Sequence, residues 1–127
     1  AGWKGLSSGV IGELISCYPS YSSELVAWIG PSISKRNYEV GREVWSLFDE
    51  RHSENVLKSS SDACAGKRLL NLVSVAESQL KQAGVGKLFS SGLCSYSDSR
   101  FFSARRFQRS DMKEFDGRLA TVALLQG

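Results

Sequence analysis

The chain has 127 residues and a formal net charge of +3; hydrophobic residues make up 42% and charged residues 23%. This length allows one domain with one core. The charge is too small to indicate a nucleic-acid partner, and no apolar run approaches the ~20 residues of a membrane span. The start lacks a secretory pattern. We therefore expect a cytoplasmic globular protein with no nucleic-acid or membrane partner.

The cysteines and the single histidine do not indicate a metal site. Cys17, Cys64 and Cys94 are odd in number and widely spaced, which predicts reduced, mostly buried thiols and no disulfide framework. Their spacings match no local zinc motif. His52 follows Arg51 at an expected helix end, and we interpret it as a surface residue near a helix C-terminus, where a partial positive charge is favoured.

The first third of the chain predicts a helix followed by a strand. Apolar residues recur at helical spacing over residues 9–17, and Ser7 or Ser8 could cap the start of this helix. A continuous apolar run over residues 25–29 ends at a Gly-Pro pair, which is typical of a buried strand.

The rest of the chain continues the alternation. A second helix is expected after Gly41, a weaker strand over residues 55–58, a long helix over 67–83, and strands over 88–94 and 121–125. Alternating helices and strands predict an α/β fold, with a mixed sheet packed between helical layers. The expected apolar faces are Val40, Val44, Leu47 and Phe48 in the second helix, and Leu69, Leu72, Val73, Ala76, Leu80 and Ala83 in the long helix.

Glycines surround the first basic residue of the chain. Gly2, Gly5 and Gly9 flank Trp3 and Lys4 ahead of the first expected helix. Backbone N–H groups in such a segment can approach an anion, and Lys4 adds positive charge. The spacing does not match a phosphate-binding loop, so a tight turn is the simpler interpretation.

Two phenylalanines and two arginines lie close together near the end of the chain. Arg105 follows Phe101 by four residues, and Arg106 follows Phe102 by four. In a helical turn each arginine would extend over an aromatic ring and present its guanidinium to a planar anion. A solvated basic turn beside a buried aromatic pair fits the same spacing, so both interpretations remain open.

Three regions in order carry a family resemblance. They are "AGWKGLSSGVI" (1–11), "WIGPSISKRNYEVG" (28–41), and "FFSARR" (101–106) with "GRLATVALL" (117–125). Together they resemble the laccase-domain family, whose members have been described as multicopper polyphenol oxidases and as zinc-dependent purine nucleoside phosphorylases with adenosine deaminase activity. The resemblance extends over residues 1–127.

The resemblance implies that residues 1–127 are the C-terminal half of a larger α/β/β/α domain. The family's metal ligands, two histidines and a cysteine, would all precede Ala1, so no metal ligand is expected in this chain. Zinc, or alternatively copper, would belong to the complete domain. Two departures stand out: Ala104 replaces the family tyrosine between F-F-S and R-R, and residues 34–37 replace a small or cysteine-containing turn.

The implied activity is phosphorolysis of adenosine, inosine or a related purine nucleoside, with adenosine deamination as a further possibility. The partners would be a purine nucleoside and phosphate. Lys4, Arg105 and Arg106 match basic positions of the family and would bind phosphate or substrate; Trp3 and Phe102 would form pocket walls or core. No catalytic residue is expected in this chain.

Two other functions compete with the phosphorylase. A copper-dependent polyphenol oxidase would need many imidazoles, and this chain has only His52. A truncated, inactive copy would act as a binding module, and unpaired apolar strands would favour self-association. Metal content separates the three: zinc favours the phosphorylase, copper the oxidase, and no metal the inactive copy.

Overall fold

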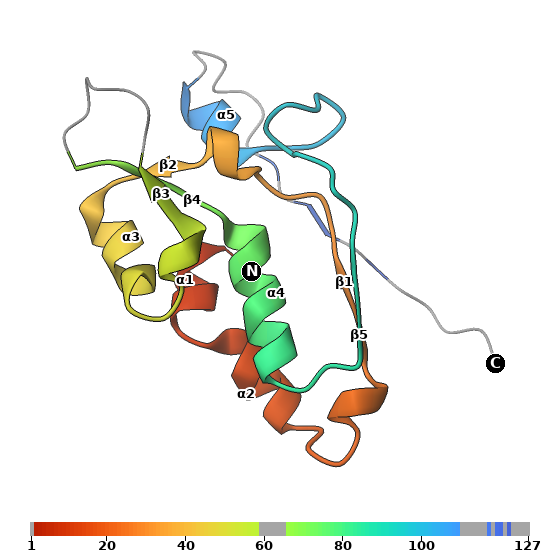
Figure 1. Ribbon diagram of the computed structural model, residues 1–127. Helices are drawn as coiled ribbons and strands as arrows, with labels where there is room; N and C mark the ends of the chain where they lie inside the picture. The colour runs from red at the N-terminus through yellow and green to blue at the C-terminus, as the bar shows by residue number, and fades with distance from the viewer. Residues whose placement is uncertain (1, 59–65, 110–116, 118, 121, 123–127) are drawn as a thin grey trace.

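The fold of this chain mixes helices with both parallel and antiparallel strands, which confirms the predicted α/β class (Figure 1). The computed structural model describes residues 2–58, 66–109, 117, 119, 120 and 122. Within these residues, no helix is long and apolar enough to cross a membrane.

The strands form two separate sheets. In the first, β1 (Val26–Ile29) pairs in parallel with β5 (Lys87–Ser90). In the second, β4 (Arg68–Leu70) lies between β2 (Glu39–Val40) and β3 (Val56–Lys58), and both of its pairings are antiparallel. The sheets come from interleaved parts of the sequence, because β5 returns to pair with the first strand of the chain.

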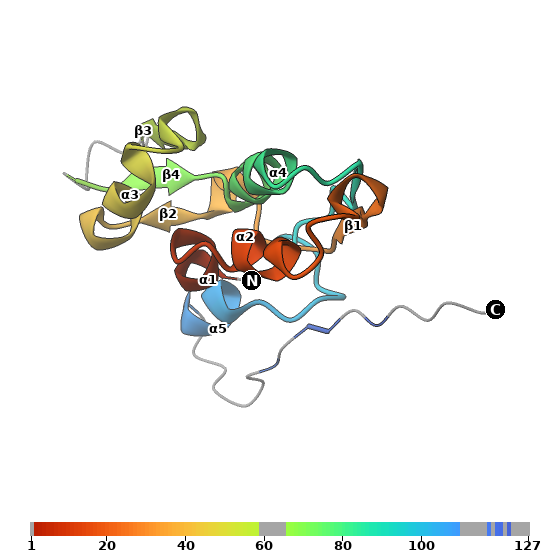
Figure 2. The same ribbon diagram turned by 90° about the horizontal axis from the view of Figure 1, so that it is seen from below.

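The helix α4 (Leu72–Gln82) lies between the two sheets, with α1 (Trp3–Ser7) and α2 (Val10–Ser16) beside it (Figures 1 and 2). The helix α3 (Arg42–Asp49) follows β2, and α5 (Ala104–Arg109) begins after Phe101 and Phe102 and contains both arginines of the pair. Three short 3₁₀ turns complete the described elements: η1 (Ser22–Glu24), η2 (Lys35–Asn37) and η3 (Ser53–Asn55).

The core lies where α1, α3 and α4 meet the three-stranded sheet. Phe48 from α3, Leu70 from β4 and Val75 from α4 are its largest fully buried side chains. Such residues dominate the hydrophobic stabilisation, at about 1.5–3 kcal/mol for each fully buried side chain. The buried cluster is Leu6, Tyr38, Val40, Val44, Phe48, Val56, Leu70 and Val75.

The predicted first helix is present as α2, but its expected cap is wrong. Gly9 precedes the helix in a left-handed conformation, with φ of 78°, and makes no side-chain cap bond. The hydroxyls of Ser7 and Ser8 instead donate back to the carbonyls of Lys4 and Gly5, at 3.0 Å each. The serines belong to the end of α1. This short helix was not predicted, because its segment is rich in glycine.

The long helix predicted over residues 67–83 is shorter in the structure. Arg68–Leu70 forms the strand β4, and the helix begins at Leu72. Asn71 sets this start, because its side-chain oxygen accepts a hydrogen bond from the backbone N–H of Ser74 at 3.3 Å. Gly84 ends the segment with φ of 81°, as its position predicts.

The strand predicted over residues 25–29 is present as β1, but it is not buried. Val26 is 62% exposed and Trp28 is 52% exposed. One face of the β1–β5 sheet is therefore only partly covered by the described residues. The strand predicted over residues 121–125 lies outside the described residues, apart from Val122.

Two further burial predictions are wrong. His52 is 5% exposed, not a surface residue, because the chain turns into η3 and brings its ring to 6.5 Å from the ring of Phe48. Cys17 is exposed at the end of α2, and Cys94 is half-buried. Both are free thiols; Cys64 lies outside the described residues.

Candidate functional site

The paired arginines lie on α5, which begins after the two phenylalanines. Ser103 caps this helix: its hydroxyl accepts the N–H of Arg106 at 3.3 Å, and its carbonyl accepts the N–H of Phe107 at 2.9 Å. Phe101 and Phe102 therefore precede the helix and do not share the helical spacing that would stack each arginine over its own ring. A serine ahead of a basic helical turn was the available sequence signal for this start.

Arg106 holds the preceding loop together. Its Nη1 donates to the carbonyls of Ser95 and Tyr96, at 3.1 and 2.8 Å, and weakly to that of Asp98 at 3.4 Å. Its Nη2 donates to the carbonyl of Phe101. One guanidinium thus satisfies four backbone acceptors, a geometry that the flat multi-donor fork permits and an ammonium does not.

Arg105 points to a different surface. Its Nη1 donates to the carbonyl of Glu39 in β2 at 2.7 Å, and its guanidinium lies 5.0 Å from the ring centroid of Tyr38. Tyr38 is 7% exposed. Burial raises the pKa of the Tyr38 phenol, while the nearby charge of Arg105 opposes that rise. Tyr38 therefore forms part of the surroundings of Arg105, although in the sequence it stands only within the segment 28–41.

Cys94 lies at the start of the loop that Arg106 organises. Its sulfur accepts the N–H of Ser34 at 3.3 Å and the Nδ2 of Asn37 at 3.5 Å, and Asn37 also donates to the hydroxyl of Ser97 at 3.0 Å. Burial raises the pKa of the Cys94 thiol, but hydrogen bonds with Ser34 and Ser97 outweigh it and lower that pKa from 9.0 to about 6. These donors stabilise the thiolate.

Asp98 and Arg100 shape the exposed end of the same loop. The Arg100 guanidinium donates to both carboxylate oxygens of Asp98, with the shortest contact at 2.6 Å. Hydrogen bonds from Arg100 lower the pKa of Asp98 to about 2. The backbone N–H of Asp98 also donates to the carbonyl of Cys94 at 3.0 Å, so the loop folds back on itself.

The remaining predicted site residues lie elsewhere or at the margin. Lys4 is on α1, with its ammonium 5.6 Å from the centroid of the Trp3 ring, and Trp3 packs against the core. Phe102 is 48% exposed and its ring lies against Gly117. In Figure 1, α1 and α5 lie at separate positions. The described contact of Lys4 is with Trp3, whereas those of the two arginines are with residues 38–39 and 95–101.

The described residues do not form a metal centre. Across residues 2–58 and 66–109, no three histidine, cysteine, aspartate or glutamate side chains are grouped so that they could hold an ion. Zinc and copper sites need three or more such ligands. The donor set of the described residues therefore does not by itself fit either metal.

Residues 1–126 match the family described as multi-copper polyphenol oxidoreductase laccase. This match spans nearly the whole chain and includes the three regions that carry the resemblance. The chain belongs to this family, as the sequence predicted.

Curated relatives carry a different functional name. The chain is 36% identical to a protein of Xylella fastidiosa named purine nucleoside phosphorylase, a comparison that covers 97% of this chain and 46% of that protein. It is 34% identical to the purine nucleoside phosphorylase YfiH of Escherichia coli, over 84% of this chain and 43% of that protein. The chain spans about half the length of the curated relatives it matches.

Solved structures confirm the fold. A Neisseria meningitidis protein superposes with a TM-score of 0.73 at 33% identity, over 84% of this chain and 44% of that one. A hypothetical protein of Bacillus licheniformis, YfiH, gives a TM-score of 0.75 at 27% identity, over 85% of this chain and 43% of that one.

Proposed function

We propose that this chain forms part of a purine nucleoside phosphorylase. In that reaction a phosphate oxygen bonds to the anomeric carbon of the ribose while the carbon–nitrogen bond to the purine breaks. The base leaves with the electron pair and takes up a proton. The observation that carries the proposal is 36% identity, over nearly the whole chain, to a relative with that name.

Arg105 is the group in this chain best placed to bind phosphate. Its contacts with other described residues use the Nη1 atom and the face toward Tyr38, which leaves Nε and Nη2 for an anion. The bond to Glu39 fixes the guanidinium orientation before substrate arrives. A pre-oriented fork binds phosphate in a bidentate manner at little entropic cost.

Arg106 would have a structural role and would not contact the substrate. Its guanidinium already serves four carbonyls of residues 95–101, so it would hold the loop beside α5 and not bind phosphate itself. Lys4 would bind substrate separately from the arginines, because α1 and α5 lie at separate positions in Figure 1.

Zinc in the complete domain and adenosine deamination remain parts of the proposal that the family resemblance alone supports. Copper-dependent oxidation of phenols is the weaker alternative. The single histidine of this chain, His52, is 5% exposed and packs beside Phe48, so it offers nothing to a copper cluster.

The test measures release of free base from inosine and adenosine by the protein at the full length of its family, with and without phosphate. Phosphate-dependent release is expected. Arg105→Lys should lower kcat/KM by about ten- to a hundred-fold, the equivalent of one charged hydrogen bond. Arg109→Lys, on the exposed end of the same helix, is the control. No release with any purine nucleoside would refute the proposal.

A further inference from the structure

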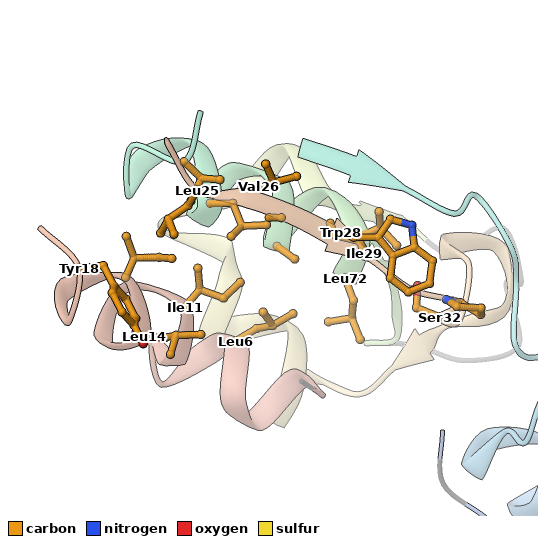
Figure 3. A pocket seen from close by; sticks show the side chains of 18 residues that line it. Leu6, Ile11, Leu14, Tyr18, Leu25, Val26, Trp28, Ile29, Ser32 and Leu72 are labelled. Carbon is orange, nitrogen blue, oxygen red and sulfur yellow. The ribbon is translucent and has the colours of Figure 1, made fainter. Parts of the chain in front are cut away.

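Two cavities lie along the helices, and their linings differ in character. The cavity in Figure 3 borders β1 and is lined mainly by apolar side chains such as Ile11 and Leu72. The second cavity has a volume of about 830 Å³ and is lined by residues of α1, α2, α3 and α4. Polar side chains predominate in it, among them Ser46, Glu50, Arg51, His52, Gln79 and Gln82. We call this second cavity the helix groove.

Two side chains of the helix groove carry a buried polar atom without a partner. His52 is 5% exposed, and its Nδ1 atom makes no hydrogen bond to any residue that the structure describes. The Oε1 atom of Gln79 is buried and unpaired in the same sense. Buried polar atoms normally have a partner, because leaving one unpaired is costly. The groove therefore contains two groups that each require a hydrogen-bond partner.

The hydrogen-bonding needs of these two atoms can be worked out. The Nε2 of Gln79 donates to the carbonyl of Leu6 at 2.8 Å, which fixes the amide orientation. Its Oε1 can therefore only accept, and it requires a donor. The Nδ1 of a neutral imidazole donates or accepts, according to the tautomer. A hydroxyl group meets either requirement, because it both donates and accepts.

A glycine inside α2 indicates that the groove is kept open. Gly12 lies in the helix interior, where glycine is destabilising relative to alanine. Its backbone does not require glycine, because its φ lies outside the left-handed region. A Cβ at this position would meet nothing within 4 Å, so the fold would accept alanine. Gly12 lines the groove, and its missing side chain leaves room there.

Charge and shape narrow the class of ligand. Glu50 and Arg51 are both exposed, lie next to each other and have opposite charges, so they favour an uncharged molecule. Leu47 is 52% exposed and supplies an apolar wall. Because the two unpaired atoms are buried, a ligand must displace a neighbour to reach them. The exposed side chains of Arg51 and Gln82 line the same groove and can change rotamer for this.

We propose that the helix groove binds a small uncharged polyol of sugar size. Its hydroxyl groups pair with Nδ1 of His52 and Oε1 of Gln79, and its carbon-bound hydrogens contact Leu47. The volume of about 830 Å³ lies within the range of small-molecule sites, about 300–1,000 Å³. This is a binding site and not a catalytic one, and the proposal is independent of the phosphorolysis proposed above.

Nitrogen NMR of the histidine ring tests the site directly. D-ribose is titrated into the protein at the full length of its family, and the ring signals of His52 are identified by their loss in His52→Gln. We expect a saturable shift of these signals with ribose and none with adenine, which has no hydroxyl group. Absence of a saturable shift with ribose would overturn the proposal. An equal response to adenine would also overturn it, because the groove would then bind a planar base.

Two variants show whether binding depends on the groove. Gln79→Leu should weaken ribose binding about fivefold, through the loss of one neutral hydrogen bond. Gln108→Leu, at an exposed position of α5 outside the groove, should leave binding unchanged. Gly12→Ala should weaken binding although it raises the melting temperature by about 1–4 °C. If this stabilised protein bound ribose as tightly as the parent, the helix groove would not be the site.

Discussion

Replacing Arg106 with lysine should destabilise the protein, although the charge is kept. The guanidinium donates to the carbonyls of Ser95, Tyr96 and Phe101, and more weakly to that of Asp98. A lysine has three donors on one nitrogen atom, so it cannot span acceptors that two guanidinium nitrogens now share. At least two charged hydrogen bonds should be lost.

The magnitude follows from these contacts. A hydrogen bond to a charged group contributes about 1.5–3 kcal/mol, and water can replace part of it because the site is only partly buried. We therefore expect a net loss of about 2–4 kcal/mol in the free energy of unfolding. For a protein of the family's length this corresponds to a decrease of about 5–10 °C in melting temperature.

The assay is thermal unfolding of parent, Arg106→Lys and Arg109→Lys proteins, with limited tryptic cleavage after Arg100 as a local readout. Arg109 is exposed on the same helix, so its lysine variant should melt close to the parent. Cleavage after Arg100 should be faster in Arg106→Lys alone, because loop 95–101 loses its anchor. If Arg106→Lys melted within about 1 °C of Arg109→Lys and its cleavage after Arg100 were unchanged, Arg106 would not be the anchor of loop 95–101.

Three smaller predictions follow. Asn71→Ala should cost about 1 kcal/mol in unfolding free energy through loss of the cap on Ser74; no change in a denaturant titration would contradict that cap. Gly86→Ala should cost about 1–3 kcal/mol, because a Cβ there would overlap the carbonyl oxygen of Ser23; a neutral result in the same titration would show that the backbone can shift. The folded pKa of Cys94, about 6, lies below the ordinary 9.0, so the thiolate's contribution to stability is present above pH 9 and lost as pH falls through 6. Alkylation of Cys94 by iodoacetamide, with the other two cysteines replaced by serine, should show a midpoint near pH 6, and a midpoint near 9 would exclude thiolate stabilisation.

Local patterns predicted the elements whose signals are contained within a few residues. The helix α2 and the end of α4 at Gly84 follow from apolar spacing and a left-handed glycine. The sequence did not predict β4, because Arg68–Leu70 continues the helical apolar stripe that follows it. Pairing with β2 and β3 decides the strand, and that pairing depends on contacts distant in sequence.

Burial was predicted less well than element type, for a related reason. The apolar run of β1 resembles a strand covered on both faces, yet Val26 and Trp28 are more than half exposed. Local sequence does not identify which residues, if any, pack over such a strand. His52 is the converse case: the turn at η3 buries it against Phe48, and a polar neighbourhood in sequence gave no sign of that.

The paired arginines show why adjacent identical residues need not share a role. Successive residues on a helix point about 100° apart, so α5 directs Arg105 toward β2 and Tyr38 and directs Arg106 toward loop 95–101. The sequence shows one basic pair, but in the fold the two residues have different roles. Arg105 is oriented by β2 and Tyr38, and Arg106 anchors loop 95–101. Arg105→Lys should therefore affect kcat/KM with little change in melting temperature, and Arg106→Lys should lower the melting temperature. If both variants instead changed the same quantity to the same extent, this division of roles would be wrong.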